Sequence, residues 1–531
     1  MGDGPETGVR LAELLAALSL GIDLGFGQPM GHVLRQCQIA MRLCEFAGAG
    51  EEARAAAYYS ALLVNVGCHT DAHEQVHWFG DDIAFKTTKY ADASSKLAET
   101  ARLLRLLGAG ATPLHRLRVG FEFAFGGHKE LEATITEHAR LARALGEELA
   151  LPPGALDALG SSYERWDGRG WPGQRRGDQI PFAARVIQLA EFAEVAYRNR
   201  GIDGAMEIAA RSSGTQFDPA LVAVLRADAE KVFHDLNEVS SWDAVLDGDP
   251  ALRVLAPDEL DDALAAIARF TDLKSPFLLG HSQAVADLAA AAAARLGMSA
   301  AERARVYRAG LAAGFGRLGV SNAIWDKPGP LTAAEWERAR LAPQLGERML
   351  HQSAALAPIA RVVGQHHERL DGSGYPAAIT GDAISRPARL LAAADSYQAM
   401  LEVRPHRPPR APDEAAAELG REIRAGRLDP DAVTAVLGAA GHRTNRRQGG
   451  VAGLTNREID VLRLAARGLP NKEIAAHLLI TPKTAGNHIE HIYAKIGATN
   501  RAGAALFAMR NGLLPEADSM EQRGEAQRRE R

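Results

Sequence analysis

The stretch HHERLDGSGYP, from His366 to Pro376, combines side chains that could take part in metal chemistry. Two adjacent imidazoles and nearby carboxylates are metal donors, and Gly372 and Gly374 allow a tight turn directly after them. Metal-assisted hydrolysis requires several such donors around the cations, with open positions for a hydroxide and for the substrate. If the stretch belongs to a working centre, other parts of the chain must supply the remaining ligands.

An internal repeat carries this stretch twice. Residues 164–195 and 368–399 align without a gap at an offset of 204, with 12 of 32 residues identical. The short matches GHVL at residue 31 and GHSQ at residue 280 lie at an offset of 249. Fixed offsets indicate a tandem repeat, so we expect two copies of one module, the first with 45 additional residues in its middle.

The elements that position these residues are predicted to be helices. Ala, Leu, Arg and Glu recur with helical spacing, and the sequence shows no βαβ rhythm. We therefore predict an all-α fold with two tandem helical bundles, residues 1–235 and 236–442, a polar linker, 443–453, and a compact domain, 454–515. The charged tail, residues 516–531, is predicted to be disordered.

The composition excludes several classes of protein. The chain has 531 residues and a net charge of −5, so any surface that binds nucleic acid has to be local. Three cysteines without CxxC spacing favour a reducing compartment. No run of about 18 uncharged apolar residues is present, and no positively charged secretory signal begins the chain. We expect a cytoplasmic protein without a membrane partner.

Residues 454–515 predict a small helical domain with a basic surface. Thr455 with Glu458 has the capping-box pattern, and Thr481 followed by Pro482 marks the start of another helix. The apolar residues of that helix share one face: Ala485, Ile489, Ile492 and Ile496. Residues 453–515 carry eight Lys and Arg against four Asp and Glu, a local positive charge of the kind that phosphate binding requires.

This segment resembles the LuxR-type (NarL/FixJ-like) helix-turn-helix of bacterial regulators, a four-helix domain, in the stretches LTNREIDVL, GLPNKEIA, TPKTAGNHI and KIGATNR. The resemblance implies binding of double-stranded DNA, commonly as a homodimer on two-fold sites. It assigns the DNA contacts to Thr481, Lys483, Thr484, Asn487, His488 and Lys495. By chemistry, the two lysines would contact phosphates, while Asn487 and His488 could reach base edges. A small helical protein–protein module is the alternative.

The stretch HHERLDGSGYP, followed by GDAI and ARLLAAADSY, is similar to the HD-GYP branch of the HD phosphohydrolases. That resemblance implies helical, metal-dependent phosphodiesterases acting on cyclic di-GMP. In the second copy it assigns four metal ligands: His281, His366, His367 and Asp395. Ala313 and Gly314 stand where the family has a His-Asp pair, Arg317 replaces a Lys, and Ala342 replaces another His. Four of about seven family ligands therefore remain.

The first copy retains fewer of these residues. His32 matches the first family His and Glu191 stands for the last Asp, whereas other types fill the remaining positions: Val64, Asn65, Ser162 and Tyr163. Two interpretations stay open for the second copy. Its four residues hold at most one divalent cation (iron, manganese or zinc), or they are polar residues hydrogen-bonded inside a helical core. The lost ligands favour the second interpretation, in which the four residues are hydrogen-bonded inside a helical core and no cofactor is required.

Two local patterns also leave alternatives open. In CHTDAHEQVH, from Cys68 to His77, His73 and His77 would share a helix face as metal ligands often do, but a solvated polar turn is the simpler interpretation. The second pattern is the glycine turn: Asp371, Gly372, Gly374, Tyr375 and Pro376. Its backbone N–H groups could bind an anion or a partner, although plain turn geometry would select the same residues.

These patterns together predict a DNA-binding transcription regulator. Its degenerate HD-GYP-like modules would act as a sensory, dimerising or partner-binding platform for a cyclic nucleotide or a signalling protein. The alternative is an active phosphohydrolase, similar to a cyclic di-GMP phosphodiesterase, coupled to DNA binding. The lost metal ligands favour a protein that is not an enzyme.

Overall fold

The computed structural model describes residues 8–90, 105–109, 112–123, 128–441 and 454–514. The predicted all-α fold is confirmed, because within these ranges β structure is confined to three isolated bridges. None of the described helices combines the length and the apolar run needed to cross a bilayer. The predicted linker, 443–453, and the predicted tail, 516–531, fall outside the described residues.

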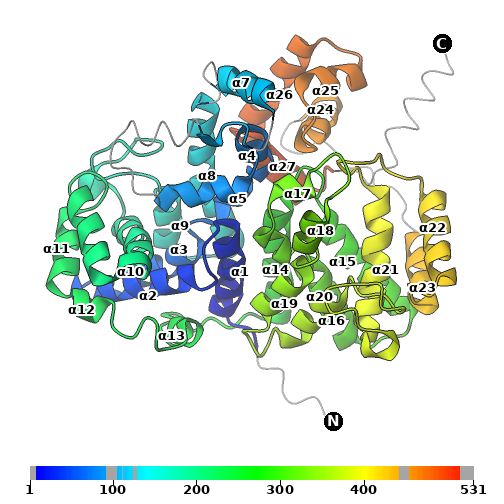
Figure 1. The fold of residues 1–531 in the computed structure, drawn as a ribbon, viewed down its shortest axis with the longest axis horizontal. Helices are drawn as coiled ribbons and strands as arrows, with labels where there is room; N and C mark the ends of the chain where they lie inside the picture. Colours follow the sequence, from blue (N-terminus) through cyan, green and yellow to red (C-terminus); the bar gives the residue numbers. More distant parts are fainter. Residues whose placement is uncertain (1–7, 91–104, 110–111, 124–127, 442–453, 515–531) are drawn as a thin grey trace. The chain divides into compact units, whose positions relative to one another are not determined.

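The chain divides into two compact units, residues 1–266 and 267–531, and the division falls inside α14 (Pro257–Asp272). The boundary expected between residues 235 and 236 lies within the first unit. The other helices of that unit (Figure 1) are α1 (Leu11–Gly25), α2 (His32–Phe46), α3 (Glu51–Leu63), η1 (Val66–His69), α4 (Ala72–Phe79), α5 (Asp82–Lys86), η2 (Thr87–Tyr90), α7 (Pro113–Glu122), α8 (His128–Glu148), α9 (Pro153–Gly160), η4 (Gly177–Gln179), α10 (Phe182–Ser212), α11 (Pro219–Ala227), α12 (Ala229–Val232) and α13 (Ser241–Asp247).

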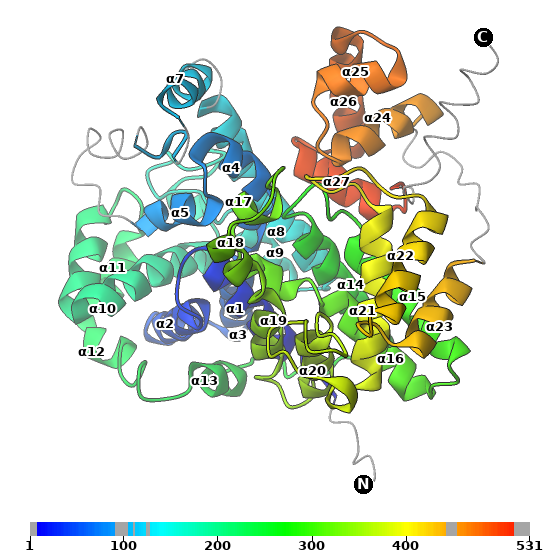
Figure 2. The same cartoon turned by 45° about the vertical axis from the view of Figure 1, so that its right-hand side comes forward.

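The second unit contains the second module and the C-terminal domain. The helices of the module (Figures 1 and 2) are α15 (His281–Arg295), α16 (Ala300–Ala312), η5 (Phe315–Gly319), α17 (Asn322–Trp325), α18 (Ala333–Ala339), α19 (Ala342–Leu350), α20 (Ala357–Gln365), η6 (Gly381–Ala383), α21 (Arg386–Leu401), α22 (Pro412–Arg424) and α23 (Pro430–Ala440). Those of the C-terminal domain are α24 (Asn456–Ala466), α25 (Asn471–Leu478), α26 (Pro482–Ile496) and α27 (Arg501–Arg510).

The two modules share local structure at the offsets found in the sequence. Asp23 accepts hydrogen bonds from the N–H groups of Gly31 at 2.7 Å and Val33 at 3.0 Å. At an offset of 249, Asp272 accepts the N–H of Ser282 at 3.0 Å. Each carboxylate satisfies N–H groups that a first helical turn leaves without an intrahelical partner. Because α2 and α15 both begin with a histidine, this contact fixes where His32 and His281 lie.

The core of each module is made of helices that contact one another around these histidine helices. In the first unit α2 packs against α3 and α10, and α3 packs against α9. In the second unit α15 packs against α16, α21 and α23, while α19 packs against α20 and η5. The buried side chains are mainly alanine and leucine, and the small alanine side chains let the helices pack closely. Several polar side chains of the same helices are buried as well.

The additional residues of the first module form an apolar cluster of their own. Its buried members are Phe79, Leu107, Val119 and Phe123, with Phe85 stacked on Phe79 at 3.8 Å between ring centroids.

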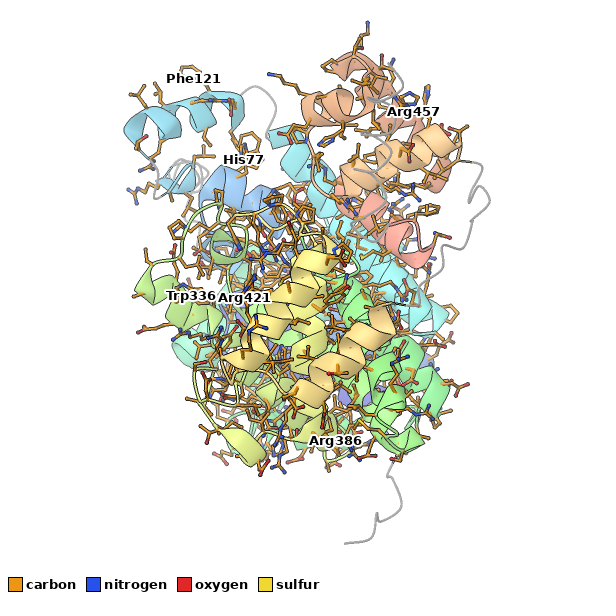
Figure 3. All side chains as sticks on the ribbon, turned by 90° about the vertical axis from the view of Figure 1, so that its right-hand side faces the viewer. His77, Phe121, Trp336, Arg386, Arg421 and Arg457 are labelled. Carbon is orange, nitrogen blue, oxygen red and sulfur yellow. The ribbon has the colours of Figure 1, made fainter. Side chains whose placement is uncertain are left out.

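Each unit also has an exposed aromatic side chain (Figure 3). Phe121 of α7 in the first unit is 61% exposed, and Trp336 of α18 in the second unit is 45% exposed.

The C-terminal domain confirms the helix starts read from the sequence. Thr455 Oγ1 accepts the N–H of Glu458 at 3.2 Å, and Glu458 accepts the N–H of Thr455 at 2.8 Å, which is the predicted capping box. Thr481 caps α26 by accepting the N–H of Thr484 at 3.1 Å, and Pro482 occupies the first helical position. Ile474, Ala475 and Leu478 of α25 are buried, as are Ala485 and Ile492 of α26.

Candidate functional site

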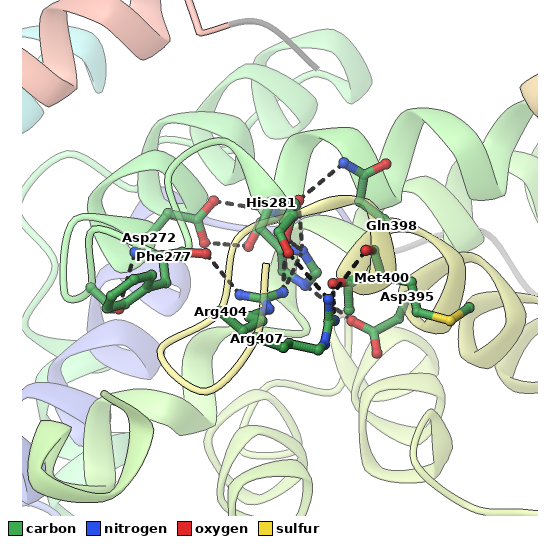
Figure 4. Close-up of polar contacts among 12 residues, drawn as sticks. Asp272, Phe277, His281, Asp395, Gln398, Met400, Arg404 and Arg407 are labelled. Atoms are coloured by element: carbon green, nitrogen blue, oxygen red, sulfur yellow. Dashed lines mark hydrogen bonds and ion pairs between the residues drawn. The ribbon is translucent and has the colours of Figure 1, made fainter. Parts of the chain in front are cut away.

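His281 of the second module lies between the carboxylates of Asp395 and Glu402, which follow it in the sequence by 114 and 121 residues. Its Nε2 is 3.0 Å from Asp395 Oδ1, and its Nδ1 is 2.9 Å from Glu402 Oε2 (Figure 4). Arg404 donates to the same Glu402 oxygen at 2.8 Å and to the carbonyl oxygen of Phe277 at 2.8 Å. The loop after α21 is thereby tied to the start of α15.

The electrostatics of this cluster favour the charged forms of its members. Burial opposes the imidazolium, but the carboxylates of Glu402 and Asp395 prevail and raise the pKa of His281. Burial likewise opposes an ionised Asp395, yet the hydrogen bond from His281 holds the pKa of Asp395 well below its usual range. Both ring nitrogens of His281 therefore face a carboxylate oxygen within hydrogen-bond distance.

The adjacent histidines His366 and His367 follow α20 and are held differently. His366 Nδ1 lies 2.5 Å from the carbonyl oxygen of Val363, and its buried Nε2 has no hydrogen-bond partner. The ring of His367 stacks on Tyr375 with 4.9 Å between centroids. Burial lowers the pKa of both histidines, so they are neutral imidazoles next to the charged cluster.

Arg317 brings a guanidinium into this cluster from η5. Its Nη2 is 4.0 Å from Asp395 Oδ1 and 3.5 Å from His281 Nε2. The Arg317 side chain is 12% exposed, and its Nη1 is buried without a hydrogen-bond partner. The structure thus brings the four predicted ligands together, but with a protein cation among them.

These residues do not fit the multi-metal centre that the HD-GYP pattern implies. Ala313, Gly314 and Ala342 supply no side-chain donors where the family has them. Within the described ranges, no group of three or more His, Cys, Asp or Glu side chains is arranged to hold an ion. The single-cation site at His281, His366, His367 and Asp395 stays a prediction.

The glycine turn after His367 is explained by its own hydrogen bonds. Asp371 Oδ1 accepts the N–H of Ser373 at 3.0 Å, and Gly372 has a φ of +80°. A Cβ at Gly374 would lie 2.3 Å from the N atom of Arg369. In the first module Asp167 accepts the N–H of Arg169 at 3.0 Å in the same way. Turn geometry accounts for both glycines, and a partner-binding role for the loop with Tyr375 and Pro376 stays a prediction.

The first module contains a second buried polar centre. Lys89 Nζ is 2.6 Å from Glu191 Oε1 and 3.0 Å from Asn65 Oδ1, and Asn65 also donates to Glu191 at 2.8 Å. His32 Nδ1 is 2.5 Å from Glu194. Burial opposes an ionised Glu191, but the charge of Lys89 and the hydrogen bonds that Glu191 accepts lower the pKa of Glu191. No sequence pattern pointed to Lys89, because it lies in the segment that the other copy lacks.

Cys68, Asp71 and His138 meet beside this centre, and the polar stretch after Cys68 is not solvated. Cys68 Sγ is 2.7 Å from Tyr163 Oη, and His138 Nε2 is 3.1 Å from Asp71 Oδ1. All four residues are buried or nearly so, since η1 packs on α8. The polar turn expected here is therefore wrong for Cys68 to Asp71. His138 lies 204 residues before Ala342, so the repeat offset could have identified it.

The recognition-helix candidates lie at the start of α26. Thr481, Lys483 and Asn487 are exposed, and Thr484 and His488 are half-buried. Ala485 and Ile492 face inward and α25 packs against α26, so the polar face of α26 is displayed on a folded support. This is the arrangement of a helix-turn-helix whose second helix presents its N-terminal residues to DNA.

Lys495 differs from the expected phosphate contact. Its Nζ is 2.7 Å from Glu458 Oε1 and 2.8 Å from Glu458 Oε2, so it joins the last turn of α26 to the first turn of α24. Hydrogen bonds from Lys495 and Thr455 lower the pKa of Glu458 to about 2. Contact between Lys495 and a phosphate would compete with this pair, and its assignment to DNA stays a prediction.

Comparison with known proteins places both parts of the chain. The HD domain family model matches residues 128–221 and 266–432, and the model for bacterial regulatory proteins of the luxR family matches residues 452–508. The chain is 30% identical over 432 residues to the 3′3′-cGAMP-specific phosphodiesterase 3 of Vibrio cholerae, covering 80% of this chain and 94% of that protein. It is 31% identical over 179 residues to the cyclic di-GMP phosphodiesterase response regulator RpfG of Xanthomonas campestris, covering 33% and 47%.

A solved structure supports the same assignment. The crystal structure of a cyclic GMP-AMP-specific phosphodiesterase of V. cholerae superposes with a TM-score of 0.58 and 26% sequence identity, covering 82% of this chain and 99% of that one. The chain therefore belongs to the HD-domain family of the HD-GYP phosphodiesterases, and it carries a C-terminal DNA-binding domain of the luxR family.

Proposed function

We propose that this protein is a cytoplasmic, DNA-binding transcription regulator whose two HD-GYP-like modules serve as a sensory, dimerising or partner-binding platform. The observation that carries the proposal is a contrast within the chain. The four-helix domain has its caps, its buried face and its exposed polar face, with a net local charge of +4 over residues 453–515. The centre of the second module, in contrast, lacks donors where the family binds metal.

The exposed face of α26 has the chemistry for contact with duplex DNA. Lys483 lies in the first turn of α26, where a helix N-terminus and a cation act together on a phosphate. Asn487 is one turn further on and exposed, and its amide can pair with the N6 and N7 atoms of adenine. Because the family's operators are two-fold, we propose that a homodimer presents two such helices.

Lys483→Ala in the full-length protein is expected to weaken binding to all duplex sequences by a similar factor. Loss of one phosphate contact should also reduce the slope of log affinity against log salt concentration by about 1. Fluorescence anisotropy with labelled duplexes over a range of salt concentrations measures both quantities. An unchanged slope would remove Lys483 from the DNA interface, and wild-type protein without salt-dependent binding would overturn the proposal.

Asn487→Ala is expected to act on sequence preference instead. Loss of a base-edge contact should cost about 1–3 kcal/mol on the preferred site and little on unrelated DNA. Lys231→Ala, at an exposed lysine of the first unit, is the matched control and should change neither quantity. Equal losses on preferred and unrelated DNA would show that Asn487 does not read bases.

Phosphohydrolase activity is a second candidate function, and the 30% identity with a 3′3′-cGAMP-specific phosphodiesterase favours it. It predicts bound iron, manganese or zinc and turnover of 3′3′-cGAMP or cyclic di-GMP by the full-length chain. Elemental analysis and product analysis test the two requirements together. A third possibility, binding of a cyclic dinucleotide without hydrolysis, predicts calorimetric heat with the same compounds and an unchanged nucleotide after incubation.

A further inference from the structure

In the first module, a lysine ammonium group lies between the two residues that take the places of family carboxylates. Asn65 stands at the Asp of the family's His-Asp pair, and Glu191 stands at the last Asp. Lys89 Nζ contacts both, at 3.0 and 2.6 Å. Three aromatic rings surround the same nitrogen, with centroids 5.5–5.6 Å away: Phe26, Tyr90 and Tyr163. Carboxylate, amide oxygen and ring faces all favour a cation at this point.

In the second module, a guanidinium lies next to the corresponding carboxylate. Arg317 Nη2 is 4.0 Å from Asp395, and the guanidinium carbon lies 6.0 Å from the centroid of Trp325. Asp395 corresponds to Glu191 at the offset of 204. Both carboxylates are buried, and a buried carboxylate needs a compensating partner. Asp395 has His281 at 3.0 Å beside Arg317, whereas Lys89 is the cation that contacts Glu191.

The two cations come from different places in the sequence. Arg317 stands at the Lys of the family pattern, whereas the corresponding residue of the first module, at the offset of 249, is Cys68. Lys89 comes instead from the additional segment of the first module. Arg317 therefore keeps a positive charge that the family pattern already has, whereas Lys89 places a cation between two positions that hold metal ligands in the family.

We propose that Lys89 replaces the metal charge of the HD centre in the first module, so that this module folds around a cation of its own side chain. The centre would then act as a metal-independent structural core. This inference does not depend on DNA binding, and its test does not use DNA.

The test compares metal content and thermal stability of the full-length protein and its variants. Wild-type protein is expected to contain less than about a tenth of an equivalent of iron, manganese or zinc, and to keep its Tm in chelator or in excess Mn²⁺. Lys89→Met is expected to lower the Tm by roughly 5–10 °C, because it leaves the buried Glu191 carboxylate without its cation. Lys89→Arg should retain most of the stability.

Arg338→Met and Lys231→Met, at exposed residues, are the matched controls and should leave the Tm unchanged. If Lys89→Met fails to fold, Lys89→Arg still separates loss of charge from loss of packing. Stoichiometric metal in wild-type protein, or a chelator-induced fall in its Tm, would overturn the proposal. So would a Lys89→Met protein as stable as the wild type.

Discussion

Asp395→Asn is expected to destabilise the second module by about 3–5 kcal/mol, the cost of removing one partner from a buried set of charges. Asp395 accepts from His281 Nε2 at 3.0 Å and lies 4.0 Å from Arg317. Asparagine keeps the volume but not the negative charge, so the Arg317 guanidinium and the His281 ring, 3.5 Å apart, lose the carboxylate that lies beside both. Urea denaturation followed by circular dichroism measures the free energy of unfolding.

The matched control for Asp395→Asn is Asp382→Asn. Asp382 is fully exposed, and its pair with Arg389 at 2.9 Å is a surface ion pair, so the change should stay within about 0.5 kcal/mol. Equal stability of the two variants would show that Asp395 carries no compensated charge. The structural account of the second centre would then be wrong.

Gly316→Ala is expected to cost about 3 kcal/mol or more in the free energy of unfolding. A Cβ at Gly316 would lie 1.8 Å from the carbonyl oxygen of Ala342 and 2.7 Å from the N atom of Gly346. Both atoms belong to the backbone of α19, so the clash cannot be relieved by turning a side chain, and η5 must move away from α19. Since η5 carries Arg317, its pairing with Asp395 should weaken as well.

Gly329→Ala is the control for this substitution, because no atom lies within 4 Å of the position its Cβ would take. Denaturant unfolding of the two variants under identical conditions compares them directly. A Gly316→Ala protein that unfolds at the wild-type denaturant concentration would contradict the close contact between η5 and α19.

The fold could be predicted from the sequence because its signals are local and repeated. Helical spacing, the caps at Thr455 and Thr481, and the unbroken alignment of the two glycine turns each depend on a few neighbouring residues. The same offsets correctly paired His32 with His281, and both residues begin a helix after a glycine in the left-handed region. Local sequence patterns and the internal repeat were therefore enough to predict the helices and the two modules.

The charge pattern of the centres could not be predicted in the same way. Glu402 contacts His281 across 121 residues of sequence, and no family position drew attention to it. Lys89 has no counterpart in the second copy with which it could be aligned. The pair of Lys495 and Glu458 joins two helices across 37 residues of sequence, so no local pattern indicates it. Such pairs depend on tertiary packing.

Selection of bound sequences from a random duplex pool by the full-length protein tests the central claim most directly. The account predicts enrichment of one two-fold-related motif, obtained without added metal, and its loss when Lys483 and Asn487 are both replaced by alanine. Failure of the wild-type protein to enrich any motif, in a preparation that hydrolyses 3′3′-cGAMP or cyclic di-GMP, would contradict the account and identify a phosphodiesterase instead.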